Sequence, residues 1–235
     1  MKIYTQAMLD AYLKNDWILK LLNKEEDVAD TEVRTHKWLK EMDNKRLVYS
    51  DVYGDLLKDK SDVSVLDVGG AYTSLTKCML KNVNYHLLDF IAHGGEATIG
   101  EIEKKCEKKF WINSDWMDAA NDSKTYDIVI ANDIFPDVDQ RMELFLDKFL
   151  PKCKELRIVL TFYNTPKYYR AKRVDDSEIL TFLSWDGDIT ALKLRKYCDR
   201  LIDTTEAEID SIIDYKDSIY RNGRQVAYVR LKGDL

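Results

Sequence analysis

The spacing of hydrophobic positions along the chain changes near residue 60. Before that point they recur every three or four residues, as in the series from Tyr4 to Leu22, and this spacing predicts amphipathic helices. From residue 62 onwards, short apolar runs alternate with stretches of helical spacing. Strands buried on both faces have such continuous apolar runs, and their alternation with helices predicts parallel pairing. We therefore expect an N-terminal helical extension (residues 1–60) followed by an α/β domain (residues 61–235).

Five apolar runs in this domain predict parallel strands. They cover residues 63–68, 85–90, 110–112, 126–131 and 156–162. Near the C-terminus, the apolar segments 209–215 and 225–231 flank Asn222-Gly223, a dipeptide typical of two-residue hairpin turns. The expected fold is a doubly wound, mostly parallel seven-stranded sheet with an antiparallel C-terminal hairpin.

Composition excludes several kinds of chemistry. The 235 residues include three histidines and four cysteines, and none of them follows a metal-ligand or C-x-x-C spacing, so we expect no metal site. Acidic side chains outnumber basic ones by 42 to 36, and the net charge of −6 argues against a broad nucleic-acid surface. No apolar run approaches the roughly 20 residues of a membrane span, and the N-terminus has no signal-peptide pattern. We therefore expect a cytoplasmic protein that does not bind membranes.

The turn after the first predicted strand is the first place to look for a ligand, because doubly wound sheets bind ligands at the carboxyl ends of their strands. Gly69 and Gly70 follow that strand directly, and small residues let the backbone approach a ligand. Asp89, at the end of the second strand, can accept hydrogen bonds from ribose hydroxyls. A dinucleotide fingerprint would have further glycines where this chain has Ala71 and Ser74, so a nicotinamide dehydrogenase is the weakest interpretation.

The segment Asp67-Val68-Gly69-Gly70-Ala71-Tyr72-Thr73 resembles the first motif of the class I S-adenosylmethionine-dependent methyltransferases, in which an acidic residue precedes a G-x-G-x-G loop. The resemblance covers roughly residues 60–235, and further landmarks follow in the family's order. It implies S-adenosyl-L-methionine as the cofactor, with Asp89 on the ribose and Asp115 on the adenine amino group. The cofactor-binding residues that it implies are Asp67, Gly69, Gly70, Ala71, Asp89, Phe90, Asp115, Trp116 and Asn132.

The loop departs from the family pattern at two positions. Ala71 and Thr73 stand where the family usually has its second and third glycines. Alanine is a mild change, but a β-branched threonine does not readily adopt a positive φ. Either the loop has ordinary φ values throughout, or the methionine tail of the cofactor is held differently.

The segment Asn132-Asp133-Ile134-Phe135-Pro136 occupies the place of the family's fourth motif and has two interpretations. In the first, Asp133 is a carboxylate at a strand end that orients or deprotonates a hydroxyl or amine, although a turn or helix-cap role explains the same residue. In the second, it is a diverged Asn/Asp-Pro-Pro-Tyr/Phe motif of amino-methyltransferases, without the two prolines, and Phe135 stacks on a base. His93, beside Gly94-Gly95, is a second candidate base or a turn residue.

Cations alternate with tyrosines after the fifth predicted strand. Arginine and lysine there can bind a phosphate or carboxylate, and a tyrosine can stack on a sugar or base. A solvated loop, whose charges pair with the acidic residues at 175–178, explains the same pattern. The candidate substrate-binding residues, besides Phe135, are Lys167, Tyr168, Tyr169, Arg170 and Arg173.

We therefore expect a methyltransferase that acts on an oxygen or nitrogen of a small, polar, anionic acceptor, such as a phosphate-bearing metabolite or a nucleotide-linked sugar. Two alternatives stay open: a nucleic-acid base N-methyltransferase, and a non-catalytic relative that binds the cofactor or serves as a scaffold. The apolar stripe of the N-terminal helices packs in the core, or forms a lid or a homodimer contact.

Overall fold

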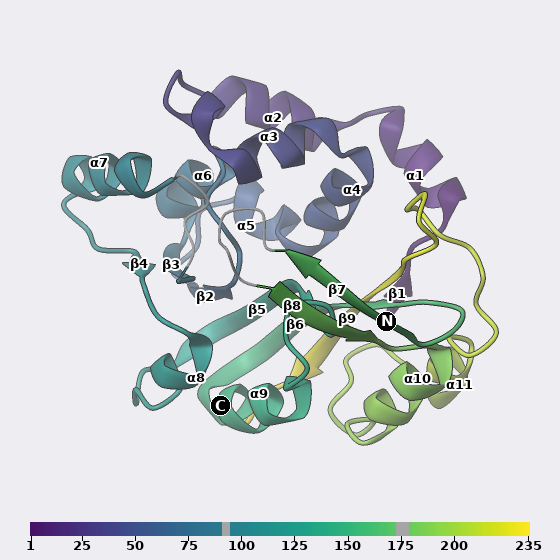
Figure 1. The fold of residues 1–235 in the computed structure, drawn as a ribbon. Coiled ribbons are helices and arrows are strands. Elements are labelled where there is room, and N and C mark those ends of the chain that lie inside the picture. The colour runs from purple at the N-terminus through teal and green to yellow at the C-terminus, as the bar shows by residue number, and fades with distance from the viewer. Residues whose placement is uncertain (91–94, 173–178) are drawn as a thin grey trace. The chain divides into compact units, whose positions relative to one another are not determined.

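The computed structural model describes residues 1–90, 95–172 and 179–235 (Figure 1). Its main sheet has seven strands. In sheet order they are β1 (Lys2–Ile3), β9 (Gln225–Lys232), β6 (Cys153–Phe162), β5 (Tyr126–Phe135), β2 (Ser64–Val68), β3 (Asn84–Leu88) and β4 (Trp111–Ile112). The chain forms two compact units, residues 9–130 and residues 1–8 with 131–235, and the boundary between them falls within β5.

In residues 9–130, the strands β2, β3 and β4 pair in parallel, with Leu66 opposite His86 and Leu88 opposite Ile112. From Val65 onwards every residue of β2 is buried, as a strand covered on both faces requires. The prediction of parallel strands in this part of the chain is confirmed, and the observed bounds differ from the expected ones by one or two residues.

Helices fill the rest of this unit, as the hydrophobic spacing predicted for the first sixty residues. They are α1 (Gln6–Leu13), whose first three residues belong to the other unit, α2 (Trp17–Glu25), the 3-10 helix η1 (Asp30–Glu32), α3 (Arg34–Glu41), α4 (Asp43–Val52), α5 (Gly54–Lys58), α6 (Leu75–Asn82), α7 (Glu96–Cys106) and α8 (Trp116–Ala119). Asp16 caps α2 and forms an ion pair with Arg46 of α4 at 2.8 Å, and α2 also packs against α6. The N-terminal helices and the strands β2 to β4 thus belong to one compact unit. A division of function at residue 60 stays a prediction.

In the second unit, β9 runs antiparallel to both β6 and β1. The remaining elements are α9 (Met142–Phe149), the 3-10 helix η2 (Leu150–Lys152), α10 (Gly187–Arg195), α11 (Glu206–Asp210) and a separate antiparallel pair, β7 (Lys167–Lys172) with β8 (Ile179–Ser184). The main sheet thus confirms the expected Rossmann-like fold class. Within the described part of the chain, no helix has the length and apolar character that a membrane span requires.

One predicted strand is wrong, because residues 209–215 form the end of α11 and turns rather than half of a hairpin. Thr205 begins α11 with a capping box. Ile209 and Ile212 are fully buried while Ile213 is 37% exposed, so the buried positions are three residues apart, as in a helical turn. Gly223 does have a positive φ of 78°, but β9 after it pairs with β6 and β1. A short apolar run does not distinguish a strand from a helical turn by its period alone.

Candidate functional site

The loop between β2 and α6 has two residues with left-handed backbone conformations. Gly69 has a φ of 63° and Ala71 a φ of 55°. Glycine adopts this region without strain, whereas an L-residue loses about 1–2 kcal/mol there. Thr73 has an ordinary φ, and its hydroxyl accepts a hydrogen bond from the amide of Leu75 at 3.2 Å. The loop therefore keeps a left-handed residue at the place of the family's second glycine, and ordinary φ values throughout are excluded.

Gly70 has no room for a side chain because of Asp67. A Cβ on Gly70 would lie 2.1 Å from Oδ2 of Asp67. The carboxyl group of Asp67 is buried and accepts hydrogen bonds from the hydroxyls of Tyr85, at 2.7 Å, and Tyr53, at 3.1 Å. Asp67 thus supports the loop from the interior of the protein. The sequence did not identify these two tyrosines as partners of Asp67. It showed only that one aromatic residue lies in the predicted strand 85–90 and the other in a predicted helix.

Burial raises the pKa of the Asp67 carboxyl to about 7, with a further contribution from the negative charge of Asp89. The hydrogen bonds from Tyr85 and Tyr53 act in the opposite direction, because they stabilise the carboxylate. Asp67 therefore titrates near neutral pH, unlike an aspartate in water.

Asp89 and Phe90 follow β3, the strand beside β2. The side chain of Asp89 is partly exposed, and its backbone carbonyl accepts a hydrogen bond from the indole of Trp111 at 2.8 Å. Phe90 is 51% exposed. A carboxylate and an aromatic ring thus lie together at the carboxyl end of β3, where the sequence placed the ribose site.

Asp115 and Trp116 follow β4, which pairs in parallel with β3. Oδ1 of Asp115 accepts a hydrogen bond from the amide of Met117 at 2.8 Å and so begins α8. Trp116 is only 6% exposed. Because neighbouring parallel strands end at the same edge of a sheet, Asp89 and Asp115 belong to one edge, as expected. Trp116 packs inside the protein, and the cap adds a structural role for Asp115.

In residues 131–235, the fourth-motif segment forms the end of β5. Asp133 has a φ of 60°, and its Oδ1 lies 3.2 Å from Nη1 of Arg224, while Asn132 is buried. Phe135 is fully buried, and its ring centroid lies 5.2 Å from that of Phe145. Phe135 therefore packs in the core and offers no ring face to a base, contrary to the role that the second interpretation gave it.

Arg224 joins a cluster that sequence reasoning missed. Its Nη1 lies 3.6 Å from Oδ2 of Asp137, and the ring centroid of Tyr220 lies 4.2 Å from its guanidinium carbon. Nε of Arg224 and Oδ1 of Asp137 are buried without a hydrogen-bond partner among the described residues. Burial and the negative charge of Asp133 raise the pKa of Asp137, and the positive charge of Arg224 offsets only part of this rise. The pKa of Asp137 therefore lies above its ordinary value. The sequence gave no signal for this cluster, because Arg224 lies far along the chain from the two aspartates.

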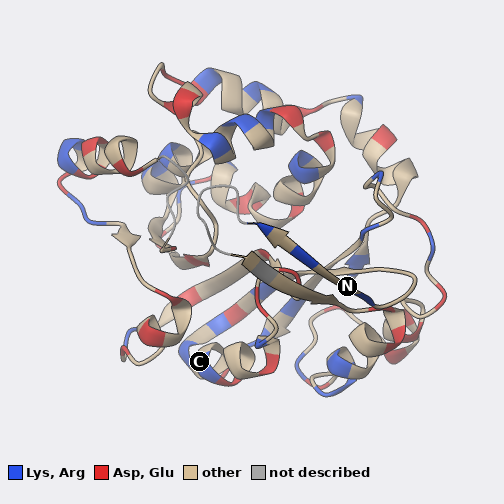
Figure 2. Cartoon of the chain, in the orientation of Figure 1, with Lys and Arg blue, Asp and Glu red and all other residues tan. Residues whose placement is uncertain are grey.

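Basic residues lie along β7, which is partly blue in Figure 2. Successive side chains of a strand point to opposite faces, so the expected substrate patch is divided. Lys167 and Tyr169 share one face of β7, and the ammonium of Lys167 lies 4.2 Å from the ring centroid of Tyr163. Tyr168, which is 72% exposed, and Arg170 lie on the opposite face. These four residues therefore do not form a single binding surface. Two further candidates, His93 and Arg173, lie outside the described residues.

Replacing Ala71 with glycine should stabilise the protein. We expect Ala71→Gly to raise the free energy of unfolding by about 1 kcal/mol, because glycine adopts a φ near 55° without strain. Ala97→Gly, at an exposed position of α7, is the matched control and should lower it by roughly 0.5–1 kcal/mol. Urea denaturation measures both, and destabilisation by both changes would contradict a left-handed Ala71.

The stability of the protein should depend on the charge of Asp67. Because folding raises the pKa of this carboxyl from 3.8 to about 7, the folded state binds more protons than the unfolded state between these values. The contribution of Asp67 to stability is therefore lost as the pH rises through this window. An asparagine does not titrate, so the free energy of unfolding of Asp67→Asn does not have this loss. Between pH 5 and pH 8, we expect it to rise by roughly 2 kcal/mol relative to that of the wild type.

Urea denaturation at these two pH values measures the change, with Asp118→Asn, at an exposed position of α8, as the control. A difference between Asp67→Asn and wild type that is the same at both pH values would show that Asp67 does not titrate there.

No protein-family model matches the sequence, and no curated protein matches it. In fold, the chain is similar to the N-methyltransferase NodS from Bradyrhizobium japonicum WM9 in complex with S-adenosyl-L-homocysteine, with a TM-score of 0.46 and 10% identity over 89% of this chain and 100% of that one. For coclaurine N-methyltransferase, bound to N-methylheliamine and S-adenosylhomocysteine, the TM-score is 0.45 and the identity 15%, over 81% of this chain and 74% of that one.

The plantazolicin methyltransferase BpumL, in complex with S-adenosylhomocysteine, gives a TM-score of 0.40 and 16% identity over 92% of this chain and 75% of that one. The strand order itself makes the chain a Rossmann-like α/β protein.

Proposed function

We propose that this protein is an S-adenosylmethionine-dependent methyltransferase that acts on an oxygen or nitrogen of a small polar acceptor. The observation that carries the proposal is the left-handed loop after β2, at Gly69 and Ala71, with Asp89 and Asp115 after the next two strands of the same parallel sheet. Ligands of doubly wound sheets bind at this edge.

The described residues fit the adenosine part of this cofactor. Ribose hydroxyls are hydrogen-bond donors, and Asp89 offers a partly exposed carboxylate at the end of β3. Phe90 adds an exposed aromatic ring beside it. We assign cofactor binding to Gly69, Gly70, Ala71, Asp89, Phe90 and Asp115, with Asp67 and Trp116 supporting them from the interior. When bound, this cofactor supplies a methyl group that already carries its leaving group, so the protein has mainly to align the acceptor and receive its proton.

A partly buried cluster of charged side chains in residues 131–235 favours an acceptor that donates hydrogen bonds. Asp133 and Asp137 share one guanidinium, that of Arg224, so the three side chains carry one net negative charge when both carboxyls are ionised. An N–H or O–H group can donate to such a cluster, whereas a phosphate is repelled by it. We therefore favour a hydroxyl or amine acceptor, with Asp133 as the residue that orients it. The anionic acceptor expected from the sequence has less support, because β7 divides the basic patch between its two faces.

Binding of S-adenosylhomocysteine tests the proposed cofactor. A ligand that binds only the folded state stabilises it by RT ln(1 + [L]/Kd), so the melting temperature should rise steadily with the logarithm of the ligand concentration. Differential scanning fluorimetry measures this rise. No shift at millimolar ligand would overturn the proposed function.

Asp89→Ala tests the ribose site. Hydrogen bonds to a charged group are worth about 1.5–3 kcal/mol, so we expect a loss of roughly tenfold to 150-fold in affinity for S-adenosylhomocysteine by isothermal titration calorimetry. Asp118→Ala, at an exposed position of α8, is the control and should leave the affinity unchanged. Wild-type affinity in Asp89→Ala would remove Asp89 from the site.

A further inference from the structure

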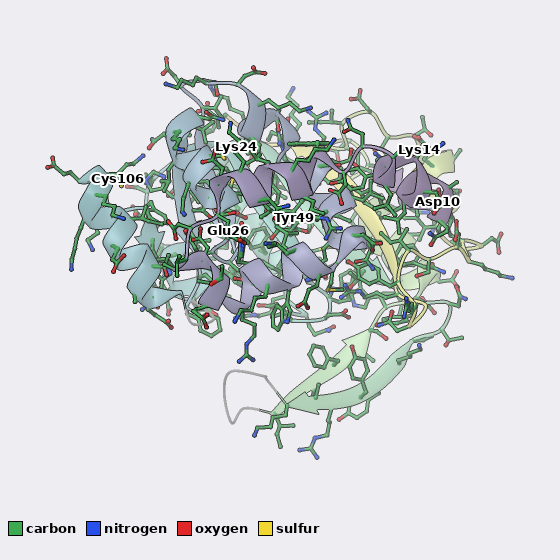
Figure 3. The ribbon with its side chains drawn as sticks, turned by 90° about the horizontal axis from the view of Figure 1, so that it is seen from above. Asp10, Lys14, Lys24, Glu26, Tyr49 and Cys106 are labelled. Carbon is green, nitrogen blue, oxygen red and sulfur yellow. The ribbon has the colours of Figure 1, made fainter. Side chains whose placement is uncertain are left out.

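Side chains from the first sixty residues donate hydrogen bonds to the backbone carbonyls of both residues next to Ala71. The hydroxyl of Thr35, in α3, donates a hydrogen bond to the carbonyl of Tyr72 at 2.5 Å. The hydroxyl of Tyr49, in α4, donates to the carbonyl of Gly70 at 3.4 Å. Figure 3 shows Tyr49 among the N-terminal helices. Gly70 and Tyr72 are the neighbours of the left-handed Ala71, so these two contacts act on the one strained residue of the loop.

Tyr72 of the loop itself donates a hydrogen bond to the N-terminal segment. Its hydroxyl donates to Oδ1 of Asp30 at 2.6 Å, and both residues are fully buried. Lys77 of α6 binds the other oxygen of Asp30 at 2.6 Å, which balances the charge of this buried carboxylate. Tyr72 thus donates to a carboxylate that Lys77 contacts through its other oxygen.

The end of the loop has a further contact with α3. The amide of Ser74 donates to Nδ1 of His36 at 3.3 Å, and Nε2 of His36 lies 2.5 Å from a carboxylate oxygen of Glu26. The Ser74 hydroxyl also donates to the carbonyl of Leu22 at 3.2 Å. The N-terminal helices therefore contact the loop along its length, within the same compact unit.

We propose that Thr35, Tyr49 and Tyr72 are positioning residues that hold Ala71 in its left-handed conformation, and thereby keep the loop in the form that binds the cofactor. This inference rests on the proposed function. A left-handed alanine is strained and persists where the surrounding contacts fix it. A glycine at this position would adopt the left-handed conformation without strain. In this chain, the contacts stabilise that conformation for an alanine. The N-terminal helices then belong to the cofactor site as its support, a role different from a lid or a dimer contact.

Thr35→Val tests the proposal, because it removes the hydroxyl and keeps the shape of the side chain. We expect the Kd for S-adenosylhomocysteine to rise about fivefold to tenfold, as the loss of one buried hydrogen bond implies. Thr31→Val is the matched control, since the Thr31 hydroxyl also donates to a carbonyl, that of Val28 at 2.8 Å, and not to a residue of the loop. It should stay within about twofold of wild type, and Thr35→Ser, which keeps the hydroxyl, should restore the affinity. Equal affinities in Thr35→Val and Thr31→Val would overturn the proposal.

Ala71→Gly separates positioning from general packing. Glycine adopts the left-handed conformation without strain, so Thr35→Val should reduce affinity less in the Ala71→Gly background than in wild type. The same loss in both backgrounds would show that Thr35 does not act through Ala71. If Thr35→Val does not fold, Tyr72→Phe takes its place, with Tyr12→Phe as control, because Tyr12 likewise donates to an aspartate, Asp16, at 2.7 Å.

Hydrogen exchange in the absence of ligand distinguishes failure of this inference from failure of the proposed function. Amides of residues 69–74 should exchange faster in Thr35→Val than in wild type, and at the wild-type rate in Thr31→Val. Faster exchange in a protein that does not bind S-adenosylhomocysteine would retain the positioning role and overturn the proposed function. Unchanged exchange would overturn the positioning role, whatever the wild type binds.

Discussion

The buried carboxyl group of Asp67 is the constraint on which the candidate cofactor site depends. It accepts hydrogen bonds from Tyr85 of β3 and Tyr53, and it leaves no room for a side chain at Gly70. The hydroxyls offset part of the cost of burying a carboxyl group, and its pKa near 7 shows that they do not offset all of it. The chain therefore retains a costly buried acid where it fixes the path of the loop after β2.

Burial raises the pKa of an acidic side chain in each compact unit, but the neighbouring groups differ. Hydroxyl groups of Tyr85 and Tyr53 lower the pKa of Asp67, whereas the guanidinium of Arg224 lowers that of Asp137. The first arrangement supports a backbone turn, and the second leaves polar atoms without partners among the described residues. An unpaired buried polar atom is costly, and the proposed function places the acceptor at the second arrangement.

Much of the fold was predictable because it depends on local patterns. Continuous apolar runs identified the strands of the parallel sheet, and the strand ends located Asp89 and Asp115 at one edge. The prediction of a terminal hairpin was wrong. Ile209 and Ile212 lie in a short apolar run, but their three-residue spacing also fits one face of a helical turn. In the same way, the sequence placed Tyr168 and Tyr169 in one patch, although a strand turns successive side chains to opposite faces.

The sequence by itself determined the N-terminal helices and the strands β2, β3, β4, β5, β6 and β9, because these follow from the period and length of the apolar runs. It did not determine β1, β7, β8 or the helical turn at Ile209. Only the tertiary structure decided what surrounds each functional group. Tyr53 and Tyr85 converge on Asp67, Thr35 reaches the carbonyl of Tyr72, and Phe135 turns into the core. These contacts join residues far apart along the chain, and the pKa of a carboxyl depends on its burial and neighbours in space, which no local pattern records.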